Sequence, residues 1–132
     1  MMPIASSMGS IAAGAMLGAW LRWFLAGQFN AAWPHLPLGT LIANVAGGFM
    51  IGFLVALLLD SPQIHPNFRL FAITGFLGGL TTFSTFSGEV VSLLLRREYA
   101  WAAGTAGVHL LGSLALTALG IALVAWLARG AA

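Results

Sequence analysis

The sequence predicts an all-α membrane protein with four transmembrane helices. Hydrophobic residues make up 60% of the 132 residues and charged residues only 6%, whereas soluble domains carry roughly 25% charged residues. Four segments are long and apolar enough to cross a hydrocarbon core of about 30 Å, which requires about 20 helical residues. We therefore expect residues 1–132 to form a single transmembrane domain.

The bounds of the four spans follow from the apolar runs and the turn residues between them. The connections read QFNAAWPHLP, DSPQIHPN and RREY, which are rich in residues that form turns. The five tryptophans fall near the ends of the spans, as an interfacial aromatic belt requires. The start of the chain lacks a charged signal-peptide region, so we interpret the first span as uncleaved. The predicted spans cover residues 8–26, 38–59, 68–95 and 100–127.

The composition argues against several classes of protein. Five arginines against three acids give a net charge of +2. With no lysine and no basic cluster beyond Arg96-Arg97, nucleic-acid binding is not expected. The absence of cysteine excludes disulfides and thiolate metal sites. The sequence contains no glycine-rich phosphate loop, nucleophile–base pairing or metal-ligand spacing, so we predict that the protein is not an enzyme.

The third span contains an unusual stretch, GFLGGLTTFSTFSGE, from Gly75 to Glu89. As one straight helix, the 28 residues of this span would run about 42 Å. A steep tilt would absorb that length, but the glycines and hydroxyl side chains favour an interruption near the centre. Non-helical backbone at this depth must be buried in protein or line a wet cavity. Its free carbonyl oxygens could bind a cation.

Polar residues on the other spans recur with helical spacing. Thr40 and Asn44 stand four apart on the second span. Asn44 could hydrogen-bond to another helix or present its NH₂ group to an anion. The polar stripe of the fourth span could face a pore or pair helices. This stripe consists of Thr105, His109, Ser113 and Thr117.

Two aromatic and two charged residues are further candidates. Phe83 and Phe86 lie three apart among hydroxyls, where they could pack as core residues or present positive ring edges to a small anion. Glu89, an acid deep in a span, could drive proton-coupled transport. We favour a structural role for it, paired with an arginine or capping backbone near the interruption. Arg22 is expected to snorkel to the interface and to raise the local anion concentration.

The distribution of arginines bears on topology. With the N-terminus inside, Arg69 and Arg129 fall on the inner side, and Arg96, Arg97 and Arg22 on the outer side. This count gives almost no positive-inside bias. It is either a weak signal in a small protein or the mark of a chain that inserts in both orientations and forms an antiparallel dimer.

Glycine pairs indicate close helix packing. Two glycines four residues apart lie on one helix face and let another helix approach closely. The sequence leaves open whether such faces pack within one chain or between chains. The pairs are Gly14-xxx-Gly18, Gly48-xxx-Gly52 and Gly75-xxx-Gly79.

These segments together resemble the Fluc family of fluoride channels, also called CrcB proteins. The stretch GFLGGLTTFSTFSGE resembles the signature of that family, while LGTLIANVAGGFMIG and GAMLGAWLRW resemble its second and first spans. The resemblance covers nearly the whole chain. It implies an antiparallel, dual-topology homodimer in the cell (inner) membrane. Two pores along the subunit interface of such a dimer would conduct fluoride passively and reject chloride.

The resemblance also implies roles for individual residues. Gly78 and Thr81 match positions whose backbone carbonyls, from both subunits, hold a structural sodium ion at the dimer centre. Arg22 matches a vestibule arginine, whereas no specific step is implied for His109, at which members vary. The pore-lining residues expected from the pattern and the resemblance are Asn44, Phe83, Phe86, Thr40, Ser84, Thr85, Ser113, His109, Thr105 and Arg22.

The function we expect is passive fluoride export, with fluoride, membrane lipid and a second copy of the chain as partners. A selective path must replace the water around fluoride with hydrogen-bond donors. The inside-negative potential, worth about 2.3 kcal/mol per charge per 100 mV, would drive the anion out. One alternative is a dual-topology exporter of cationic drugs, but residues 8–26 lack the acid that such exporters use. Another is a membrane assembly subunit that transports nothing.

Overall fold

Residues 3–59, 61 and 63–130 of the chain are described by a computed structural model. Within these residues, four segments are long and apolar enough to cross a membrane, so the predicted all-α fold with four spans is confirmed. The bounds of the first, second and fourth segments are α1 (Ile4–Phe29) with the 3₁₀ turn η1 (Asn30–Ala32), α2 (Leu38–Leu59) and α6 (Tyr99–Gly130). The third segment contains α3 (Pro66–Arg69), the π-helix η2 (Leu70–Leu77), α4 (Gly78–Leu80) and α5 (Phe83–Leu95).

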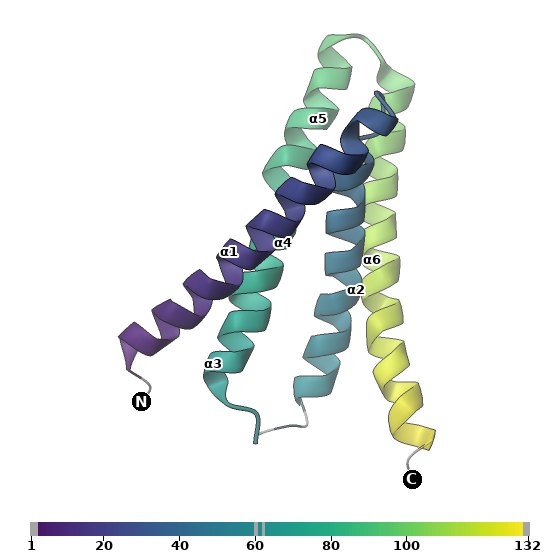
Figure 1. The fold of residues 1–132 in the computed structure, drawn as a ribbon. Coiled ribbons are helices and arrows are strands. Elements are labelled where there is room, and N and C mark those ends of the chain that lie inside the picture. Colours follow the sequence, from purple (N-terminus) through teal and green to yellow (C-terminus); the bar gives the residue numbers. More distant parts are fainter. Residues whose placement is uncertain (1–2, 60, 62, 131–132) are drawn as a thin grey trace.

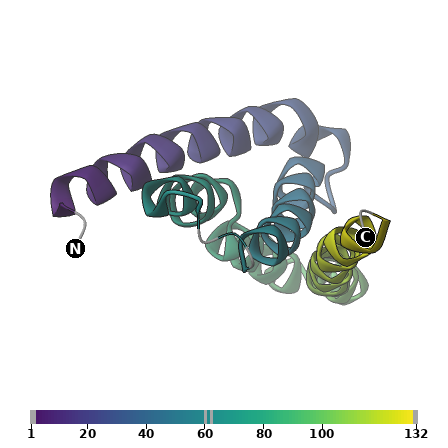
Figure 2. The same ribbon diagram turned by 90° about the horizontal axis from the view of Figure 1, so that it is seen from below.

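The helices pack mainly in two pairs. α2 runs side by side with α6, and α1 crosses η2 and α4 at an angle (Figure 1). Seen from below, α2 lies between the first half of the third segment (α3 and η2) and α6, whereas α5 contacts α6 directly (Figure 2). The two ends of the chain lie at one end of the bundle, and the connections before α2 and before α6 lie at the other (Figure 1). An even number of spans produces this arrangement.

Glycines form the contacts within both pairs. A Cβ atom on Gly14 or Gly18 of α1 would overlap backbone atoms of η2, and one on Gly52 of α2 would meet the Thr117 carbonyl of α6. Gly48, Gly75 and Gly79 are enclosed by neighbouring backbone in the same way. The glycine pairs therefore pack within one chain, which answers the question that the sequence left open. Bare backbone faces let the helix axes approach closely.

Arg69 fixes the end of α2. One of its terminal nitrogens donates to the carbonyls of Leu58 at 2.8 Å and Ser61 at 2.9 Å. The last carbonyls of a helix have no partner within the helix, and a cation there also complements the helix dipole. The Arg69 side chain thus ties the C-terminal end of α2 to the start of the third segment.

An aromatic and charged cluster closes the opposite end of the bundle. The His35 ring stacks on Trp101 with ring centroids 4.8 Å apart, and its Nε2 lies 3.3 Å from Glu98 Oε2. The Nε of Arg96 donates to Glu98 Oε1 at 2.9 Å. These contacts join the connection before α2 to the turn between α5 and α6.

Candidate functional site

The candidate site begins where the third segment loses helical geometry. Thr81 (φ −80°, ψ 153°) and Thr82 (φ −150°, ψ 116°) are extended and separate α4 from α5. Thr82 then caps α5, because its Oγ1 accepts a hydrogen bond from the Thr85 N–H at 3.1 Å. Threonine is a favoured N-cap residue for this reason. The local sequence therefore starts a new helix directly after three glycines have weakened the preceding one.

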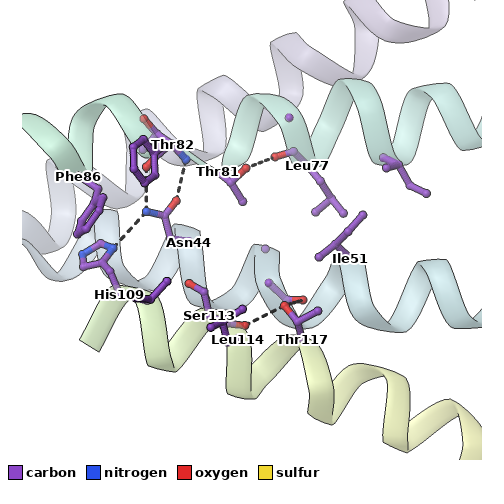
Figure 3. Close-up of a pocket in the computed structure, with 16 residues that line it drawn as sticks. Asn44, Ile51, Leu77, Thr81, Thr82, Phe86, His109, Ser113, Leu114 and Thr117 are labelled. Atoms are coloured by element: carbon purple, nitrogen blue, oxygen red, sulfur yellow. Dashed lines mark hydrogen bonds between the residues drawn. The ribbon is translucent and has the colours of Figure 1, made fainter. Parts of the chain in front are cut away.

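Asn44 of α2 holds the peptide groups of Thr82. The Thr82 N–H donates to Asn44 Oδ1 at 2.7 Å, and Asn44 Nδ2 donates to the Thr82 carbonyl at 2.9 Å (Figure 3). Extended backbone between two helices has no helical partners for these groups, and leaving them unpaired inside a membrane protein would be costly. One side-chain amide thus replaces the helix hydrogen bonds at this position.

A cavity of about 490 Å³ lies beside this amide, between α2, the third segment and α6. Most of its lining is apolar; Asn44, Thr82 and His109 lie together at one end, and the Ser113 and Thr117 hydroxyls lie further along α6 (Figure 3). Of the residues expected from the sequence to line a pore or bind sodium, those that line it are Asn44, Phe83, Phe86, His109, Ser113, Gly78 and Thr81. The tertiary structure therefore brings together candidates from three different spans.

The two phenylalanines of α5 have different surroundings. Their ring centroids lie 5.5 Å apart with an interplanar angle of 60°. Phe86 packs on the His109 ring with centroids 4.7 Å apart. Phe83 is 80% exposed in the single chain. One ring is therefore fixed inside the bundle, whereas the other lies at the edge of the cavity and faces outward.

A second cavity of about 340 Å³ lies along the other half of α5 and reaches His35 and Arg96 at the end of the bundle. Thr85 and Glu89 line it. Glu89 Oε1 accepts a hydrogen bond from Thr40 Oγ1 at 2.6 Å. Among the described residues, Glu89 thus bonds a hydroxyl, and neither an arginine nor backbone, which were the two structural partners suggested by the sequence.

The remaining candidates line neither of these two cavities. Arg22 Nε donates to the Gly79 carbonyl at 2.9 Å. Arg22 lies within α1, which continues to Phe29, and its side chain reaches the end of α4; its expected position at the membrane interface stays a prediction. Thr105 Oγ1 donates to the His35 carbonyl at 3.3 Å, and Ser84 Oγ lies 3.3 Å from Thr82 Oγ1.

Two residues matter more than the sequence suggested. Thr82 was only one hydroxyl among several, yet its N–H, carbonyl and side chain all form hydrogen bonds at the site. A threonine directly before an apolar residue, here Phe83, is a recognisable helix-start signal that could have singled it out. Asn30, whose Oδ1 accepts from the Thr40 N–H at 3.1 Å, lies in a connection and gave no comparable signal.

Replacement of Thr40 by valine is expected to destabilise the protein. Thr40 is 2% exposed, and valine keeps its shape but removes the hydrogen bond to the Glu89 carboxylate. Leaving the half-buried Glu89 carboxyl without its hydroxyl donor costs about 1–3 kcal/mol. The measurement is the temperature at which half of the monodisperse size-exclusion peak of the detergent-solubilised protein is lost. Thr40→Ser, which retains the hydroxyl, should behave like the wild type, and equal stability of the two variants would contradict the assignment.

The fold and the site define a class of protein: a four-span helical membrane protein with polar groups gathered at an interrupted third segment. The chain matches the family model described as CrcB-like protein, Camphor Resistance (CrcB), over residues 10–121. The chain therefore belongs to the CrcB family.

Curated relatives agree with this placement. The chain is 51% identical to a protein of Acinetobacter baylyi over 94% of this chain and 98% of the relative. It is 54% identical to one of Nitrosospira multiformis over 93% of this chain and 96% of the relative. A protein of Pseudomonas syringae pv. maculicola is 53% identical over 84% and 87%, respectively. All three are named Fluoride-specific ion channel FluC. Since ion channels are not enzymes, the prediction that the chain is not an enzyme is confirmed.

Proposed function

We propose that this chain is a fluoride-selective channel that exports fluoride passively across the cell inner membrane. The names of relatives with more than half of their residues identical support fluoride as the transported ion. The observation that carries the proposal is the Asn44–Thr82 pair, which places an interrupted helix beside a cavity that contains Phe86 and His109.

The chemistry of this site suits a small, strongly hydrated anion. The Ser113 hydroxyl and the imidazole N–H of His109, which line the cavity, can supply hydrogen-bond donors, and the edge of an aromatic ring is positive. Among the described residues that line the 490 Å³ cavity, none is acidic, so no carboxylate repels an anion there. A larger halide such as chloride would be held less closely by donors in fixed positions.

The channel we propose is an antiparallel, dual-topology homodimer with two pores. Phe83 is 80% exposed, and Leu110 and Leu114, which line the same cavity, are 61% and 60% exposed. The single chain therefore leaves its cavity open on one side, and a second copy against this face would complete the wall. The balanced arginines at the two ends of the bundle support insertion in both orientations.

We also propose that the carbonyls of Gly78 and Thr81 hold a structural sodium ion at the dimer centre. In a continuous helix the Thr82 and Thr85 N–H groups would occupy these two oxygens. Thr82 N–H instead donates to Asn44, and Thr85 N–H donates to Thr82 Oγ1. Unwound carbonyls of this kind coordinate sodium in membrane transporters. The ion would supply positive charge that holds two interrupted segments together.

Phe83→Ile is expected to reduce fluoride efflux from liposomes by at least about tenfold, because isoleucine offers no positive ring edge. Efflux is measured with a fluoride electrode after valinomycin has clamped the potential with potassium. The matched control is Phe68→Ile, since Phe68 is exposed on α3 and lines neither cavity.

Unchanged efflux in Phe83→Ile would contradict the role given to this ring. Efflux that needs a proton gradient, or proton-dependent uptake of a lipophilic cation, would favour the drug-exporter alternative. No flux of any ion in the wild type would favour the assembly subunit.

A further inference from the structure

His109 is a buried imidazole with only one of its nitrogens paired. The side chain is 3% exposed. Its Nδ1 lies 3.2 Å from Asn44 Nδ2, and one ring face packs against Phe86. Nε2 has no hydrogen-bond partner among the residues that the structure describes. A buried polar group without a partner is uncommon in native proteins and indicates a site for a ligand, ion or water.

The hydrogen bonds of Asn44 determine which imidazole nitrogen carries the proton. Because the Thr82 N–H donates to Oδ1, the other end of the Asn44 side chain must be the NH₂ group. That group has two hydrogens, and one of them is directed at the Thr82 carbonyl. The second meets His109 Nδ1, which must therefore accept. The proton of the neutral imidazole then resides on Nε2, since the partner of one ring nitrogen fixes the tautomer.

We propose that Asn44 is a positioning residue that holds His109 in the Nε2–H tautomer, and that this N–H donates to fluoride on the ion path. The inference rests on the proposed function. It revises the role that the sequence suggested for Asn44, because both hydrogens of its amide are already used within the protein. Between these two side chains, the donor that remains available is the imidazole N–H.

The packing around His109 suits this role. Phe86 of α5 covers the ring at 4.7 Å, which restricts its rotation about χ2. Asn44 is itself held by two hydrogen bonds to backbone. Its amide therefore cannot flip to present its oxygen to a protonated Nδ1 of His109. A donor whose position and tautomer are both fixed selects a small acceptor without reorganising when the anion arrives.

The tautomer can be read by ¹⁵N and ¹³C NMR of histidine-labelled, full-length protein in lipid bilayers. The chain has three histidines, and the His109 signals are those lost in His109→Gln. We expect protonated Nε2 and unprotonated Nδ1 in the wild type, and the reverse in Asn44→Asp, because a carboxylate at this position accepts rather than donates. Fluoride, but not chloride, should shift the Nε2 resonance of the wild type.

Transport by two variants separates a donor at Nε2 from mere filling of space. The amide of His109→Gln can place an N–H near the position of Nε2, and efflux should stay within about threefold of the wild type. The shorter amide of His109→Asn reaches only the position of Nδ1, and efflux should fall at least about tenfold, the cost of a lost bond to a charged group. His65→Gln, an exposed histidine outside the site, is the control.

A proton on Nδ1 in the wild type, or equal efflux in His109→Gln and His109→Asn, would overturn the inference. Absence of fluoride efflux in the wild type would overturn the proposed function and the assignment of fluoride as the ligand. The NMR result would still report the tautomer that Asn44 imposes, so the two failures are distinguishable.

Discussion

Replacement of Asn44 by alanine is expected to reduce fluoride efflux from liposomes to the background leak. The substitution leaves the N–H and carbonyl of Thr82 without the partner that holds them at 2.7 and 2.9 Å. Each buried backbone group left unpaired costs about 1–3 kcal/mol, and the backbone between α4 and α5 would relax to recover those bonds. Phe83 and Phe86 begin the next helix and would move with it. Initial efflux rates at matched protein density provide the measurement.

The matched control for this prediction is Gln28→Ala. Gln28 carries an amide near the end of α1, is exposed, and forms no side-chain hydrogen bond within the described part of the chain. Its efflux should equal that of the wild type. Wild-type efflux in Asn44→Ala protein that elutes as a single peak would show that the path does not depend on this amide.

Gly52→Ala is expected to destabilise the protein, whereas Gly→Ala substitutions at exposed helix positions are not. The added Cβ would meet the backbone carbonyl of Thr117, and backbone cannot rotate aside as a flexible side chain can. Overpacking at such a contact costs about 1–3 kcal/mol, more than the roughly 1 kcal/mol that alanine contributes through helix propensity. The temperature at which half of the monodisperse peak is lost in detergent should fall.

Gly27→Ala in α1 is the corresponding control. A Cβ at Gly27 meets no atom within 4 Å, so only the gain in helix propensity remains and stability should be unchanged or slightly higher. Equal stability of Gly52→Ala and Gly27→Ala would contradict the close contact between α2 and α6.

Much of the fold could be predicted because hydropathy and turn residues are local properties. The second span was predicted at residues 38–59, and α2 has these bounds. The π-helix Leu70–Leu77 was not predicted, because its apolar composition is equally compatible with an α-helix. A π-helix is recognised by hydrogen-bond register, which composition does not encode.

The site could be predicted only in part, because sequence patterns place residues on faces but do not pair them. Periodicity identified Asn44 and His109 as polar positions on different spans, and the structure brings them to 3.2 Å. The hydrogen-bond partners of the Asn44 amide were not predictable, because they are backbone groups of Thr82 on the third segment and are free only where that backbone is extended. Likewise, the bond of Glu89 to Thr40 depends on the alignment of α2 with α5. The roles of these residues in ion passage stay predictions.

The central claim is that donors gathered around the interrupted third segment pass fluoride and reject larger halides. It is tested most directly by halide-resolved efflux from liposomes that contain the wild-type protein, with valinomycin present and fluoride and chloride electrodes recording together. We expect rapid fluoride efflux, with chloride efflux no faster than that of protein-free liposomes. Comparable efflux of both halides, or release of neither, would contradict it.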